Sequence, residues 1–73
     1  RGEHLAALEH KTVHGCEGMT LIYCGVGEVH VIVCDESVEL KADEAARLDG
    51  YAGEIKLCSK TGAKLMLAKA KAV

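Results

Sequence analysis

Polar and apolar residues alternate along several short stretches of this chain, and this alternation limits the fold more than any other feature. In Glu28–Cys34, the residues Val29, Val31 and Val33 share one face. Successive side chains of a strand point to opposite sides, so a period of two predicts a half-buried β-strand. Met19–Cys24 is apolar on both faces, which is typical of a central, doubly covered strand. Similar alternation runs through residues 38–42, 54–58 and 64–67.

Turn-forming residues separate these stretches. Gly25-Val26-Gly27 offers two glycines that can supply the positive φ of a tight hairpin, so we expect one strand to end there and the next to begin. Further turns are indicated at Asp35-Glu36-Ser37, Asp49-Gly50 and Ser59-Lys60-Thr61-Gly62. About six short strands at this spacing predict an all-β sandwich or barrel.

Two segments favour a different structure. Residues 42–48 are rich in helix formers, as is Glu3–His10. A helix of that length is marginal without tertiary support. The alternative fold is therefore an α+β arrangement with a short helix near residues 42–48.

The core available to such a domain is thin. The chain has 73 residues, and a single domain over 1–73 buries only about 60–65% of the surface that its unfolded chain exposes. Phe and Trp are absent, and Tyr23 and Tyr51 are the two aromatic residues. Small domains usually need disulfides, a metal or a partner surface as well. Since the sequence starts at Arg1 without Met, it is either the whole protein or a fragment of a longer two-domain chain.

Charge and hydropathy exclude two classes of partner. The formal net charge is −2, so the basic surface that nucleic-acid binding needs is missing. No apolar run approaches the roughly 20 residues of a membrane-spanning helix, and the N-terminus lacks a signal-peptide core. We therefore expect no nucleic-acid partner, no membrane partner and a cytoplasmic location.

The four cysteines are Cys16, Cys24, Cys34 and Cys58, and they contain no C-x-x-C motif. The strand pattern already explains small apolar residues at several of these positions. We therefore expect free thiols in a reducing compartment. Paired cysteines, with three possible connectivities, are the alternative.

The candidate metal ligands are His10, His14, Cys16 and His30. Imidazole and thiolate donors suit zinc, iron or copper. In an extended strand, however, His10 and His14 lie about 13 Å apart, too far to share one ion unless the chain bends. The alternative for His30 is a cross-strand carboxylate neighbour. No order of Ser, Cys, His and acidic residues matches a catalytic triad, so we expect no catalytic residue.

Taken in order, these features resemble the C-terminal cupin domain of pirin-like bicupins, a family that includes proteins with quercetin 2,3-dioxygenase-type activity. Val38–Ala45 is similar to the family's L-x-x-G-D-A turn, with the glycine replaced around Asp43. The resemblance implies a small cupin-like β-sandwich or barrel of the jelly-roll type. The other segments that carry it are Leu5–Glu9, Thr12–His14, Leu21–Val29, Ile55–Leu57 and Ala63–Leu67.

The chain departs from the family at the metal-binding positions. Metal-binding cupins have an H-x-H…E set and a further His after a P-x-G turn. Here His14-Gly15-Cys16 offers one His and one Cys, and the second motif has no Pro and no suitable His. In pirin-like bicupins the N-terminal cupin holds the metal. The resemblance therefore implies a non-catalytic accessory cupin without a cofactor, whose more apolar sheet face packs against another cupin domain, in cis or as a homodimer.

Three alternatives stay open. The chain is a small His/Cys metal-binding domain if the candidate ligands converge. It is a cupin dioxygenase subunit if a second copy or domain completes the site. It is an engineered scaffold without activity if the absence of Pro, Asn, Gln, Phe and Trp reflects a restricted alphabet.

Overall fold

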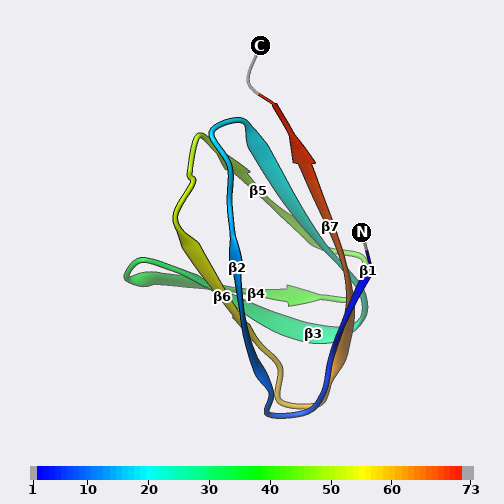
Figure 1. Cartoon of the computed structure of the whole chain (residues 1–73). Helices are drawn as coiled ribbons and strands as arrows, with labels where there is room; N and C mark the ends of the chain where they lie inside the picture. The colour runs from blue at the N-terminus through cyan, green and yellow to red at the C-terminus, as the bar shows by residue number, and fades with distance from the viewer. Residues whose placement is uncertain (1, 72–73) are drawn as a thin grey trace.

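The computed structural model describes residues 2–71, so Arg1, on which the fragment expectation rests, lies outside it. These residues form β-strands without any helix, which confirms the all-β prediction (Figure 1). Within residues 2–71, accordingly, no helix has the length and apolar character needed to cross a membrane. The strands are β1 (Gly2–Leu5), β2 (His10–His14), β3 (Met19–Val33), β4 (Glu36–Lys41), β5 (Ala45–Asp49), β6 (Glu54–Cys58) and β7 (Ala63–Ala70).

Strand β3 is the long element that links the whole architecture. Its first part pairs antiparallel with β5 and β7, and its second part pairs antiparallel with β4 and β6. Strand β1 extends the first group by pairing with β7, and β2 extends the second by pairing with β6. Two curved layers, β1-β7-β3-β5 and β2-β6-β3-β4, therefore share one strand, which bends as it passes between them (Figure 1).

The hairpin expected at Gly25-Val26-Gly27 is wrong, because the chain passes through this segment without reversing. The register of β3 against β7 shifts between Cys24 and Val26, and Gly27 has a φ of 84°. A bulge followed by a glycine at positive φ bends a strand and increases its twist. The bulge and Gly27 thus redirect one strand into a second layer. The reversal comes later, at the two-residue turn between Val33 and Glu36.

The helix considered near residues 42–48 is also absent. Asp43 has a φ of 71°, which interrupts any right-handed helix, and β5 begins two residues later. Within β5, Ala46 and Leu48 pack against the core while Arg47 is exposed. Pairing with the central strand β3 and burial of one face override the helix propensity of this segment.

The core lies between the two layers and consists of aliphatic side chains and one thiol. Residues that alternate along each strand supply it, as the period-two pattern predicts. It forms one cluster, and Thr20 and Ser59 are buried beside it. The buried members are Leu5, Ile22, Cys24, Val29, Val31, Leu40, Ile55, Leu57, Ala63 and Leu65.

Candidate functional site

The structure separates the metal ligands that the sequence suggests. His10 and His14 lie at opposite ends of β2, and both are exposed. Cys16 lies in the following loop, where its Sγ donates to the carbonyl oxygen of Met19 at 3.4 Å and sits 3.6 Å from Thr20 Oγ1. His30 belongs to β3 and is half-buried. Among residues 2–71, the group of potential metal ligands whose donor atoms lie close together contains His30 but neither His14 nor Cys16.

His30 instead belongs to a row of polar residues across the outer face of the layer β2-β6-β3-β4. In register, His10 lies opposite Cys58, Cys58 lies opposite His30, and His30 lies opposite Glu39. The neighbouring residues of β3, Val29 and Val31, are buried in the core, so this row faces away from the interior. The cross-strand carboxylate neighbour considered for His30 is Glu39.

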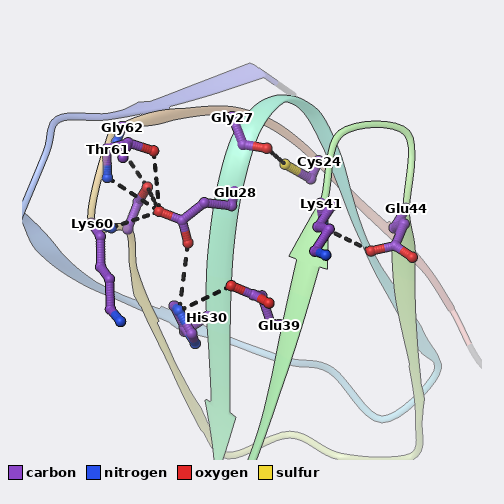
Figure 2. Close-up of polar contacts among 11 residues, drawn as sticks. Cys24, Gly27, Glu28, His30, Glu39, Lys41, Glu44, Lys60, Thr61 and Gly62 are labelled. Carbon is purple, nitrogen blue, oxygen red and sulfur yellow. Dashed lines mark hydrogen bonds and ion pairs between the residues drawn. The ribbon is translucent and has the colours of Figure 1, made fainter.

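Three side chains converge on this outer face, namely Glu28, His30 and Glu39 (Figure 2). His30 Nε2 lies 3.5 Å from Glu28 Oε2 and 3.5 Å from Glu39 Oε2. One donor atom from each residue lies within 4.8 Å of the other two. Glu28 and His30 are two residues apart on β3, and the β3–β4 turn brings Glu39 alongside them.

The other oxygen of Glu28 is held by the turn between β6 and β7 (Figure 2). Glu28 Oε1 accepts hydrogen bonds from the backbone N–H of Lys60 at 2.8 Å and of Thr61 at 3.1 Å. The hydroxyls of Ser59 and Thr61 lie at 3.0 and 3.2 Å from the same oxygen. These contacts fix the carboxylate so that Oε2 points to His30.

The environment of Glu28 favours its ionised form. Partial burial raises the pKa of this carboxyl group, but the hydrogen bonds from Lys60, Ser59 and Thr61 together lower it by more. The pKa of Glu28 therefore lies below its ordinary value of 4.5. The carboxylate presents a negative Oε2 to the imidazole of His30.

Glu28 Oε2 and His30 Nε2 are nearly inaccessible to water, and neither has a hydrogen-bond partner. Buried polar atoms are usually satisfied, so two orphans that face each other require an explanation. The sequence indicated neither glutamate. The sequence feature that could have identified Glu28 is its spacing from His30, because residues two apart on a strand lie on the same face. Glu39 could not be placed, because the turn was expected at Asp35–Ser37 rather than one residue earlier.

A second surface lies on the outer face of the other layer. It comprises Met19, Leu21 and Tyr23 of β3, Met66 and Ala68 of β7, and Ala45 of β5, and we call it the apolar face. The exposed ion pair of Arg47 and Asp49 on β5 lies beside Leu21 and Met19 and borders this face. Tyr23 lies directly between Ala45 and Met66, and Leu21 lies beside Ala68. Met66 is 52% exposed. No strand within residues 2–71 covers these side chains.

Comparison with solved structures identifies the fold. A cupin superfamily protein from Desulfitobacterium hafniense DCB-2 matches with a TM-score of 0.74 at 17% identity, over 88% of this chain and 58% of that chain. A cupin-2 domain containing protein from Shewanella frigidimarina NCIMB 400 matches with a TM-score of 0.74 at 14% identity, over 96% of this chain and 67% of that chain. No family model and no curated protein matches the sequence. The chain has the cupin fold, and it spans 58% of the first of these proteins and 67% of the second.

Proposed function

We propose that this cupin-fold chain is a non-catalytic accessory module that packs against a partner cupin domain through the apolar face. It would correspond to the metal-free half of pirin-like bicupins. The observation that carries the proposal is the outer side of β3, where Met19, Leu21 and Tyr23 follow one another without a charged residue and the charged pair on β5 lies only at the border. An antiparallel sheet normally has polar residues on its solvated face, so an apolar outer face favours a covering partner.

The interior of the fold supports a non-catalytic role. Aliphatic side chains such as Ile22, Val29 and Leu57 fill the space between the two layers. His14 and Cys16, which the resemblance places at the metal position, do not converge with further ligands. The polar cluster lies on the outside instead.

The partner that suits the apolar face best is a second copy of the same cupin fold. A stable interface buries about 800 Å² on each partner. The chain exposes 4681 Å², so an interface of that size covers roughly a sixth of its surface. A net charge of −2 opposes self-association only weakly. A cupin domain in the same polypeptide would present an equivalent surface.

The thiols favour a reducing compartment and hence the cytoplasm. All four cysteines are free, and Cys34 is exposed. Burial raises the pKa of the Cys24 thiol, and the carboxylates of Glu28, Asp43 and Glu44 raise it further. That thiol is thereby kept protonated and unreactive.

Sedimentation velocity over a concentration series tests the interface. We expect the wild-type chain to form a dimer, and Met66→Lys to shift it to the monomer by burying an unpaired charge. Leu8→Lys is the matched control, because Leu8 is 75% exposed and lies in the turn after β1, outside the apolar face. A wild-type chain that stays monomeric at every concentration and unfolds in two states would contradict the proposal.

A further inference from the structure

The cluster of Glu28, His30 and Glu39 has the dimensions of a metal site. Zinc bonds to nitrogen and oxygen ligands are about 2.0–2.2 Å long, so tetrahedral geometry places ligand atoms roughly 3.3–3.6 Å apart. His30 Nε2 lies 3.5 Å from an oxygen of each glutamate. These two separations are too long for good hydrogen bonds and match the spacing of ligands around one ion. The two glutamate oxygens lie within 4.8 Å of each other, so a rotation of the exposed Glu39 side chain would bring all three donors to one ion.

The orphaned atoms point to the same conclusion by a separate route. Glu28 Oε2 and His30 Nε2 are buried and lack hydrogen-bond partners, although the rest of the Glu28 carboxylate is fully engaged. A cation between them would satisfy both atoms. It would also offset the repulsion between the carboxylates of Glu28 and Glu39. Because Oε1 is held by the β6–β7 turn, Oε2 is already oriented before any ion arrives.

We propose that Glu28, His30 and Glu39 bind one divalent transition-metal ion, zinc being the best match, on the outer face of the layer β2-β6-β3-β4. One imidazole and two carboxylates form a donor set that suits zinc or cobalt better than magnesium or calcium, which prefer oxygen ligands alone. The three protein ligands leave a fourth tetrahedral position for water or an exogenous donor. The site is separate from the apolar face, so it does not depend on the proposed dimer.

The direct test is titration of the purified chain with zinc by calorimetry, after treatment with a chelator. We expect one zinc per chain and a rise in melting temperature on binding, since an ion that binds only the folded state stabilises it. Magnesium and calcium should bind far more weakly. Absence of stoichiometric zinc binding, or equal affinity for magnesium, would overturn the proposal.

Two variants separate the proposed ligands from the structural role of Glu28. Glu28→Gln keeps an oxygen that can accept from Lys60 and Thr61 but turns an amide nitrogen toward His30, so the turn is preserved while a ligand is lost. Glu28→Gln and His30→Ala should each lower zinc affinity about 100-fold or more. Even the mutation of a residue that only hydrogen-bonds to a metal ligand lowers metal affinity about 10–100-fold. His10→Ala is the matched control, because His10 belongs to the same cross-strand row and is exposed. Unchanged affinity in His30→Ala would assign the zinc to other residues.

Cobalt reports which atoms hold the ion. A tetrahedral cobalt complex of one imidazole nitrogen, two carboxylate oxygens and a water has visible d–d bands without sulfur-to-cobalt charge transfer. Cys58 lies opposite His30 and is the nearest thiol in register. We expect the cobalt spectrum of Cys58→Ser to match the wild type. A charge-transfer band that disappears in Cys58→Ser would overturn the three-residue assignment.

Discussion

Glu28 holds several polar contacts at once. Its Oε1 accepts hydrogen bonds from Ser59, Lys60 and Thr61 in the β6–β7 turn, and its Oε2 faces His30 (Figure 2). Removing it by Glu28→Ala would leave the N–H groups of Lys60 and Thr61 without their acceptor. We expect Glu28→Ala to cost about 2 kcal/mol of unfolding free energy and Glu28→Gln to cost less, since hydrogen bonds to charged groups contribute about 1.5–3 kcal/mol. Urea unfolding at neutral pH measures both values.

The same carboxylate makes stability depend on pH. The pKa of Glu28 is lowered in the folded state below the ordinary value of 4.5, so its ionised form stabilises the protein above that pH. This contribution is lost as the pH falls through the lower pKa of the folded state. In Glu28→Gln it is missing at every pH. We therefore expect the stability difference between wild type and Glu28→Gln, measured by urea unfolding, to be full well above pH 4.5 and to shrink as the pH falls below 4.5 through the lowered pKa of the folded state. A difference independent of pH would be the contrary result.

At the scale of elements, the bend in β3 decides the architecture, and two glycines in it have different roles. A Cβ at Gly27 would lie 2.1 Å from the carbonyl oxygen of Gly62, and Gly27 has a φ of 84°. A Cβ at Gly25 would lie 3.5 Å from the carbonyl oxygen of Lys64, which is ordinary contact. Gly27 is therefore required where β3 passes from one layer to the other, while Gly25 is replaceable.

Alanine substitutions test this difference. Gly27→Ala should destabilise the fold by about 3 kcal/mol, because backbone strain and overlap with Gly62 add together. Gly25→Ala should change stability by no more than about 0.5–1 kcal/mol, since its backbone needs no positive φ. Thermal and urea unfolding of the two variants measure the contrast. Equal destabilisation would mean that the bend does not depend on Gly27.

At the scale of the molecule, a small core without Phe or Trp leaves little reserve of stability. The free energy of unfolding of a domain is about 0.05–0.15 kcal/mol per residue, or roughly 4–11 kcal/mol for 73 residues. Leu57 is fully buried, so Leu57→Ala should cost about 3 kcal/mol. If a second copy covers the apolar face, the melting temperature of this variant should rise with protein concentration. Leu8→Ala, at a 75% exposed position, is the matched control and should change stability by less than about 0.5 kcal/mol.

The sequence alone determined the all-β class and the inward face of most strands, because a period of two assigns alternate residues such as Val29, Val31, Ile55 and Leu57 to one side. The bend in β3, the strand at residues 45–49 and the polar cluster were decided by the tertiary structure, because each depends on contacts between residues far apart in the sequence. Gly25–Gly27 bends a strand rather than ending it, because Gly27 meets Gly62, and residues 45–49 are a strand because β3 offers them a pairing edge. The polar cluster also required the fold, since the register that places Glu39 beside His30 is fixed by the β3–β4 turn and not by local sequence.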